Sequence, residues 1–429
     1  MVINIRRHLR NESQSLSIRS KSSQHENSLN LNQLKAWDSK HYQIHNLLCQ
    51  SDDNVVKIFQ GIHVSSNKPV AIKIIDVDCS DEYLETVCHE ISTINSLQHD
   101  NIMPMLASFV DGPLLWNVMS NAQLGSADLW SKPNGLSELA IALIVKDVLS
   151  ALNYLHKKGI IHRAVCGSHI LINSNGSCML TGLKYSTTVL QKGRWQPNIH
   201  QYPKNSVKLL NFLAPEILEQ NLIGYNSKSD IYSLGIVCCE LANGCTPFED
   251  IVLTEMLLDK LTGNFPRPLD STCEEILNFP LDCEDITPEV RSKYDMYKNR
   301  TYTPWFHTFT IELCLNFDSC SRPTASELIN HHFVKQTKKC HRNLVELLMT
   351  SDSSSSPLPN HRNYNRIQNE KMFMLETKIR PTGSAASNHP EKITIDEAKC
   401  LEPNVKISEA IKNLRVSDDS TQFEIDWIF

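Results

Sequence analysis

The 429-residue sequence lacks several features that would assign it to a common functional class. It has no basic excess, because 42 lysines and arginines are set against 48 aspartates and glutamates, for a net charge of −6. Nucleic acid is therefore not expected as a partner, since its recognition needs a basic surface. No run of apolar residues reaches the roughly 18 to 20 that a membrane helix requires, so a membrane partner is not expected either.

The cysteines show no spacing that indicates a metal site or a set of disulfides. The chain has 14 of them, no C-x-x-C sequence occurs, and the closest pair is Cys238 and Cys239. Such a scattered distribution favours neither zinc binding nor a disulfide framework. Because free thiols persist in reducing compartments, the composition predicts a cytoplasmic protein, with the nucleus as a second location.

By composition, the chain divides into a central region and polar ends. Residues 1–40 are polar and basic and are expected to form a disordered arm, although Arg- and Ser-rich composition is also typical of a transit peptide. Residues 42–120 alternate apolar strands with turns around one helix, and residues 121–334 are mostly helical. The tail 335–422 is polar and is expected to be mostly disordered. It begins with a helix-like run that ends at 351-SDSSSSPLPN-360, and the tract after that run is too poor in apolar residues to fold alone. An aromatic peptide, 423-FEIDWIF-429, follows it.

A lysine and a glutamate stand out in the strand-rich region. The segment 69-PVAIK-73 reads as a strand, in which Ala71 and Lys73 share one face. The helix expected at 82–98 has an apolar stripe, and Glu90 lies within about 60° of it. A carboxylate on the shoulder of a buried face needs a cation, and Lys73 is the obvious candidate. The alternative is a surface lysine beside an ordinary amphipathic helix.

The stretch 162-HRAVCGSHI-170 follows a helical run and precedes a strand, a turn and a second strand. It resembles the catalytic loop of protein kinases, H-R-D-L-x-x-x-N. Further kinase landmarks follow in the right order and spacing: the hinge-like stretch from Met119 to Ala122, the triplet 214-APE-216, the run 229-SDIYSLG-235, and Arg322. The chain thus resembles the protein-kinase fold over residues 42–334, which is an α+β, bilobal fold with a small β-rich N-lobe and a larger α-helical C-lobe.

The resemblance assigns roles to the matching residues. It implies a buried ion pair between Glu216 and Arg322, and it implies that Asp230 binds the backbone of the catalytic loop. It also implies a nucleotide pocket in which Lys73 and its helix glutamate position the phosphates. The residues expected at this ATP site are Ala71, Lys73, Glu90, Met119, Ala122 and Lys184.

The residues that perform phosphoryl transfer in kinases are replaced in this chain. Ala164 stands where kinases have the aspartate that orients the attacking hydroxyl, and His169 stands where they have a metal-binding asparagine. The D-F-G position reads 182-GLK-184, so Gly182 replaces the main metal ligand, and the lid segment 48–58 has no glycine. The general base alone is worth about 10² to 10⁴ in rate. Metal stabilisation adds several kcal/mol. The sequence therefore predicts no catalytic residue, no bound metal and no kinase activity.

Other stretches narrow the resemblance to the STRAD pseudokinase adaptors, which are relatives of the sterile-twenty kinases. These stretches are the H-R-x-V-x-x-S-H-I-L-I pattern, G-L-K at the D-F-G position, 220-QNLIGYNSKSDIYSLGI-236 and 240-ELANGCTPF-248. STRAD proteins end in Trp-Glu-Phe, and this chain ends in Trp427, Ile428 and Phe429. It departs from them at Ile428, which replaces the glutamate, and at Lys73, where familiar STRAD proteins have arginine.

The STRAD resemblance implies an inactive adaptor that binds and allosterically activates a Ser/Thr kinase of the LKB type. The segment 185–212 would face that kinase. A second partner would be an armadillo-like helical-repeat scaffold of the mouse-protein-twenty-five family, which would bind Trp427, Ile428 and Phe429. A tail that folds back on the domain is the alternative for these three residues.

The resemblance also implies that ATP can bind without Mg²⁺, with Lys73 and Lys184 offsetting part of its charge. Lys184 pointing to solvent is the alternative. Two other functions stay open from the sequence. One is an atypical but active Ser/Thr kinase that uses His169 or another group, and the other is a nucleotide-gated switch that senses ATP.

Overall fold

The structure is a computed structural model, and it describes residues 38–51, 55–191, 193–203, 209–220, 222–278, 288–340 and 342–351. The lid residues 52–54 lie outside these ranges, as do most of the predicted N-terminal arm and everything after residue 351. Trp427, Ile428 and Phe429 therefore lie outside the described residues, and their predicted role is not addressed by the fold.

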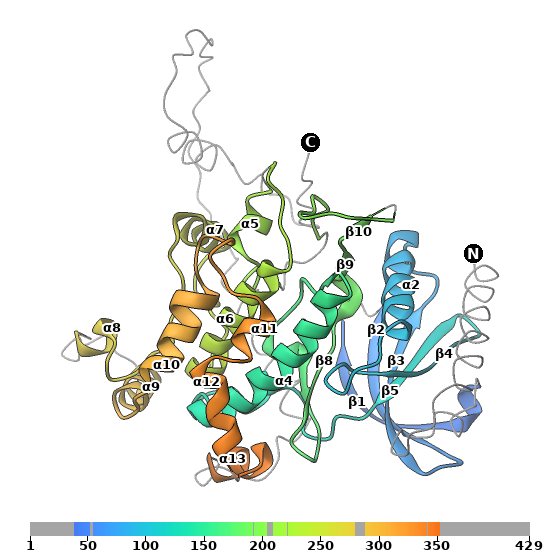
Figure 1. Ribbon diagram of the computed structural model, residues 1–429. Coiled ribbons are helices and arrows are strands. Elements are labelled where there is room, and N and C mark those ends of the chain that lie inside the picture. The colour runs from blue at the N-terminus through green and yellow to red at the C-terminus, as the bar shows by residue number, and fades with distance from the viewer. Residues whose placement is uncertain are drawn as a thin grey trace, which may run out of the picture. The chain divides into compact units, whose positions relative to one another are not determined.

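The N-lobe is a five-stranded antiparallel sheet with one long helix, α2, packed against it (Figure 1). The strand order is β1-β2-β3-β5-β4. The Ser80 side chain begins α2 by accepting a hydrogen bond from the Tyr83 amide, and the apolar stripe of the helix then faces the sheet. The elements are η2 (Ser39–His41), β1 (Tyr42–Gln50), β2 (Val56–His63), β3 (Lys68–Asp76), α2 (Asp81–Asn95), β4 (Met105–Asp111) and β5 (Leu114–Ser120).

The C-lobe is mostly helical, and short strands flank its catalytic loop (Figure 1). The first part comprises α3 (Ala127–Ser131), α4 (Glu138–Lys157), β6 (Ile160–Ile161), η3 (Gly167–His169), β7 (Ile170–Ile172), β8 (Cys178–Leu180), η4 (Leu183–Tyr185), β9 (Thr187–Thr188), β10 (Leu190–Gln191) and β11 (Arg194–Trp195). The second part comprises α5 (Pro215–Leu218), α6 (Lys228–Asn243), α7 (Leu253–Thr262), α8 (Glu274–Leu277), α9 (Pro288–Lys298), α10 (Pro304–His307), the π-helix η6 (Thr308–Cys314), α11 (Ala325–Leu328), α12 (His332–Lys335), η7 (Gln336–Lys339) and α13 (Leu344–Ser351).

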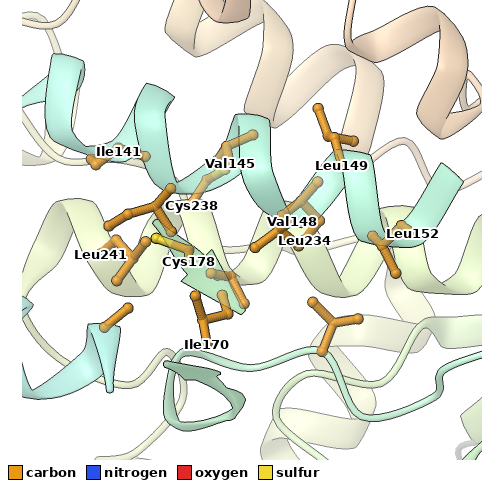
Figure 2. Packing of buried hydrophobic residues seen from close by; sticks show 14 of the residues in the cluster. Ile141, Val145, Val148, Leu149, Leu152, Ile170, Cys178, Leu234, Cys238 and Leu241 are labelled. Carbon is orange, nitrogen blue, oxygen red and sulfur yellow. The ribbon is translucent and has the colours of Figure 1, made fainter. Parts of the chain in front are cut away.

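Two buried helices, α4 and α6, form the centre of the C-lobe core. Figure 2 shows Val145 and Val148 of α4 beside Leu234 and Cys238 of α6, with Ile170 of β7 beneath them. By length and composition alone, α4 could cross a membrane, which corrects the expectation that no such run exists. Because ten of its twenty residues are buried in this core, α4 is accounted for as the central helix of the lobe.

The bilobal α+β prediction is confirmed, and the helix-like run predicted after the domain boundary at residue 334 is present as α13. The helix α13 follows that boundary, and its residues Leu344 and Leu348 are buried in the main core of the C-lobe. Asn343 also donates a hydrogen bond to the Asn175 carbonyl at 2.9 Å. The first part of the predicted polar tail therefore belongs to the folded lobe, because its leucines recur at helical spacing and find an apolar face.

Candidate functional site

Lys73 and Glu90 form the ion pair that the sequence predicted. The Lys73 Nζ atom lies 2.6 Å from Glu90 Oε2, and both side chains are largely buried. Lys73 comes from β3, and Glu90 comes from the buried side of α2. The pair therefore ties α2 to the sheet, and the alternative of a surface lysine is excluded.

The other residues predicted at the ATP site lie on the neighbouring strand and the hinge. Ala71 on β3 is paired across the sheet with Met119 near the end of β5, so the two residues are neighbours. Ala122 follows β5 and accepts a hydrogen bond from the Gly125 amide at 3.1 Å, which closes the turn into the C-lobe. These positions match a kinase hinge, whereas their contact with a nucleotide stays a prediction.

Asp230 binds the backbone behind the catalytic loop, as the sequence predicted. It is fully buried in the first turn of α6 and accepts hydrogen bonds from the amides of His162 at 2.9 Å and Arg163 at 2.8 Å. His156 Nε2 lies 2.8 Å from the same carboxylate. Burial alone would raise the pKa of Asp230, but the hydrogen bonds from His156 and from the backbone hold that pKa below its usual value. The loop therefore rests on a buried carboxylate that stays charged.

His162 is neutral, and its hydrogen bonds fix its tautomer. Its Nε2 lies 3.0 Å from the Thr181 carbonyl and must donate, whereas its Nδ1 accepts from the Ala164 amide at 3.2 Å. Burial lowers the pKa of His162 to about 4, which agrees with this arrangement. The histidine serves as a rigid connection between the catalytic loop and the segment before Gly182.

Ala164 lies in an apolar setting where kinases have their catalytic aspartate. It is 1% exposed and belongs to the same buried cluster as Val165 and Leu209. Alanine has no carboxylate, so this position offers neither an acid nor a base. The setting suits alanine and gives no support to a catalytic acid or base.

His169 and Gly182 fit against each other. A side-chain carbon at Gly182 would lie 2.5 Å from His169 Nδ1, so the imidazole fills the space that an aspartate there would need. Gly182 also has φ 88°, a left-handed conformation that favours glycine. The two replaced motif positions are therefore matched sterically, since the histidine can lie where it does only beside a glycine.

The surroundings of the His169 imidazole favour its charged form. Its Nδ1 donates to the Ala164 carbonyl at 2.7 Å. Burial disfavours the charged form, but Cys166, the Ala164 carbonyl and the Glu90 carboxylate together raise the pKa of His169 to about 9. A cation thus replaces two metal ligands of a kinase site. Within the described part of the chain, no group of three His, Cys, Asp or Glu residues could hold a metal ion.

Lys184 lies against α2, which differs from both placements considered from the sequence. Its ammonium is 4.2 Å from the centre of the Tyr83 ring and 5.2 Å from that of Tyr185. A second contact nearby joins the same elements, because His89 Nε2 of α2 lies 2.8 Å from the Ser186 carbonyl. The D-F-G region is thus bound to α2 by protein groups, and a role for Lys184 at a nucleotide phosphate stays a prediction.

Arg163 holds the segment that follows the D-F-G region, a role that sequence reasoning missed. Its Nε donates to the Tyr185 carbonyl at 2.5 Å, and its Nη1 donates to the Gln201 carbonyl at 2.8 Å and to the Tyr225 hydroxyl at 2.9 Å. Tyr225 in turn donates to the Gln201 carbonyl. The arginine was visible as part of the H-R-x motif, but most of its acceptors are backbone carbonyls, which no side-chain pattern reveals.

The framework pair Glu216–Arg322 is present as predicted. Arg322 Nη1 lies 2.6 Å from Glu216 Oε1, and Arg322 Nη2 lies 3.0 Å from Oε2, so the pair is bidentate. Arg322 also donates to the Asn316 carbonyl at 2.6 Å and is 1% exposed. Both charges are therefore paired, and the pair joins α5 to the segment before α11.

Comparison with known proteins agrees with this geometry. Residues 54–334 match the family model described as the protein kinase domain. STE20-related kinase adapter protein alpha of Rattus norvegicus is 42% identical over 279 residues, covering 61% of this chain and 71% of that protein. The human alpha protein is 37% identical over 317 residues, covering 70% and 73%. The human beta protein is 34% identical over 324 residues, covering 70% and 76%.

These matches show both the domain type and the family of the chain. The chain has a protein kinase domain, which accounts for its two lobes and its framework pairs. Within that class it belongs to the family of STE20-related kinase adapter proteins, the STRAD family that the sequence indicated.

Proposed function

We propose that this protein is a catalytically inactive adaptor that binds a Ser/Thr kinase of the LKB type and activates it allosterically. One observation carries the proposal: an intact kinase framework surrounds a site whose replaced residues fit each other. Asp230 and the Lys73–Glu90 pair are in place, while His169 fills the space beside Gly182. Such an arrangement keeps the shape of a kinase and removes the groups that orient a hydroxyl and hold metal.

An atypical active kinase is the main alternative, with His169 as the base. The geometry disfavours it, because His169 Nδ1 is already engaged with the Ala164 carbonyl, and the raised pKa of the ring favours its protonated form. A protonated imidazole cannot accept the proton of an attacking hydroxyl. Ala164 offers no second base.

In this proposal ATP binds as a ligand without Mg²⁺. Lys73 and the His169 imidazolium supply positive charge near the expected phosphates, and Ala71, Met119 and Ala122 are placed to line the adenine side. Neither His169 nor Gly182 offers the hard oxygen ligands that Mg²⁺ prefers. An ATP-sensing switch is the second candidate function, and the contacts of Lys184 with Tyr83 favour it, because a nucleotide that draws Lys184 away would loosen α2.

The second partner in the proposal is an armadillo-like helical-repeat scaffold of the mouse-protein-twenty-five family, bound through Trp427, Ile428 and Phe429. The complex acts in the cytoplasm and in the nucleus. The support for an adaptor role is the family, whose members are named kinase adapter proteins.

The test of inactivity is an assay with radiolabelled ATP and either Mg²⁺ or Mn²⁺, using generic substrates and the protein itself. No incorporation above background is expected. Stoichiometric labelling that disappears in Lys73→Met, a variant that removes the phosphate-positioning cation, would establish the atypical kinase instead.

The test of nucleotide binding is a thermal shift titration with ATP, with and without Mg²⁺. A ligand that binds the native state raises its stability by RT ln(1 + [L]/Kd). Equal shifts in both conditions are expected, and His169→Asn should reduce them. A shift that needs Mg²⁺ would contradict the proposed mode of binding.

A further inference from the structure

Lys260, on α7, is a fully buried lysine that no motif accounts for. It is 1% exposed, and its ammonium donates to three backbone carbonyls, those of Leu210 at 3.1 Å, Asn211 at 2.7 Å and Leu213 at 2.8 Å. An ammonium group has three donors, so each is used. The buried lysine thus binds the backbone of one short segment, residues 210–213.

The surroundings of this ammonium are aromatic and carbonyl groups. The rings of Tyr232 and Phe248 have their centres 5.5 Å and 5.4 Å from its Nζ atom. Burial holds the pKa of Lys260 well below its usual value, and Glu216 opposes that shift. A buried lysine is costly unless its donors are satisfied, so the three carbonyls are what make this position tolerable.

The piece of backbone that Lys260 binds is the end of the segment 185–212 and the residue after it. Ser233 of α6 donates to the Phe212 carbonyl at 2.8 Å, so all four carbonyls from Leu210 to Leu213 accept hydrogen bonds from α6 or α7. The Asn211 side chain donates to the Pro247 carbonyl at 3.0 Å. Without these donors, the carbonyls of Asn211, Phe212 and Leu213 would lose these partners in a buried setting, where an unpaired carbonyl is unfavourable.

The same helix turns exposed apolar side chains outward. Met256, one turn before Lys260, is buried with it, whereas Leu258 is 42% exposed and Val252, just before α7, is 66% exposed. In the segment itself Trp195 is 60% exposed and Leu190 is 50% exposed. The buried side of α7 thus contacts the end of the segment. The exposed side of α7 and the segment both carry exposed apolar side chains.

We propose that Lys260 is a positioning residue for the partner-binding surface, which joins α7 and the end of the segment 185–212 into one rigid unit. This inference rests on the proposed adaptor function. A partner kinase would then meet α7 and residues 209–213 in a fixed relative position, and removing the lysine donors would let residues 209–213 move away from α7.

The test uses the full-length protein with Lys260→Met, which keeps the length of the side chain and removes its donors. Hydrogen exchange is measured at the amides of Phe212 and Leu213, which are bonded to the carbonyls of Leu209 and Leu210. We expect at least tenfold faster exchange there and unchanged exchange in α4. Affinity for the partner kinase should fall at least tenfold. Lys335→Met, a change at an exposed lysine of α12, is the matched control and should alter neither.

The outcomes separate this inference from the proposed function. Unchanged exchange at Phe212 and Leu213 in Lys260→Met overturns the inference, and so does faster exchange with unchanged partner affinity. If wild-type protein binds no kinase partner, the adaptor function fails, while the exchange result still decides the anchoring role. If Lys260→Met does not fold, Ser233→Ala takes its place, with a threefold or greater local effect expected and unchanged exchange contradicting the inference.

Discussion

The back and the front of the catalytic loop are held in opposite ways. Behind the loop, Asp230 is a buried charge whose oxygens accept hydrogen bonds from backbone amides and from His156. In front of it, Ala164 lies in an apolar cluster, and His169 packs against Gly182. The kinase shape therefore depends on residues behind the catalytic loop, whereas phosphoryl transfer in kinases depends on the positions in front of it.

The physical reason is the cost of leaving a buried charge without its partner. Losing Asp230 or Arg322 would leave amides or a carboxylate buried and unpaired, so the framework resists change. The catalytic carboxylates serve substrate and metal, so their loss leaves no protein group unsatisfied. In a protein that does not transfer phosphoryl groups, Ala164 and the His169–Gly182 pair can therefore replace the catalytic residues without destabilising the fold.

The largest effect on stability is expected in the framework, at the buried Glu216–Arg322 pair. Arg322→Met leaves Glu216 without its bidentate partner and should lower the free energy of unfolding by about 3 to 5 kcal/mol. Urea denaturation measures the change. The control is Arg267→Met, because Arg267 and Glu275 form a 3.5 Å pair that is about half exposed and should cost less than about 1 kcal/mol. Equal losses in both variants would refute the contrast between the two regions.

The next loss of stability is expected in front of the catalytic loop, when the aspartate of kinases is restored at position 182. Gly182→Asp forces a side chain into the imidazole and into a left-handed conformation, which costs about 1 to 3 kcal/mol before the clash is counted. Adding His169→Asn removes the clash, so the double variant should be more stable than the two single effects predict. Strict additivity in this double-mutant cycle would mean that the two positions are not coupled.

The C-terminal aromatic residues are predicted to contribute to scaffold binding and not to the stability of the kinase-like domain. Changing Trp427 and Phe429 together to alanine should weaken scaffold binding at least tenfold, because aromatic anchors supply much of the energy of a peptide contact. The melting temperature of the kinase-like domain should stay the same. Normal scaffold binding by this variant would remove the tail as an anchor, and a lower melting temperature would show that it packs on the domain.

A dependence on pH is also expected at the front of the loop. The pKa of His169 is raised from 6.5 to about 9, so the native state is stabilised by the charged ring. That stabilisation is complete below pH 6.5 and is lost as the pH rises to about 9. The difference in free energy of unfolding between wild type and His169→Asn should therefore narrow over this interval. A difference that stays constant from pH 6 to 9.5 would show that folding does not raise the pKa of His169.

The sequence predicted the fold, the Lys73–Glu90 pair and the role of Asp230, because these follow from regular spacing within elements and from motifs of fixed geometry. It also predicted a helix-like run after residue 335, but not the burial of the leucines of α13. Their burial depends on an apolar face of the C-lobe that only the folded chain provides.

The contacts of cations with rings and carbonyls could not be predicted. Lys184 lies against Tyr83, and Lys260 binds three carbonyls, yet in sequence both resemble ordinary charged residues. One signal was available for Lys260, because it follows Met256 by four residues on a helix and so shares its buried face. The fit of His169 to Gly182 required the backbone conformation of both.

The most direct test of an adaptor with a kinase shape and no kinase chemistry is the activity of a partner Ser/Thr kinase of the LKB type, titrated with this protein and the scaffold. A parallel reaction contains a catalytically dead partner, so that any transfer by this protein itself is visible. The account predicts a rise in partner activity that saturates with binding and no labelling in the parallel reaction. Labelling with the dead partner that is abolished by Lys73→Met, or binding with no change in partner activity, would contradict it.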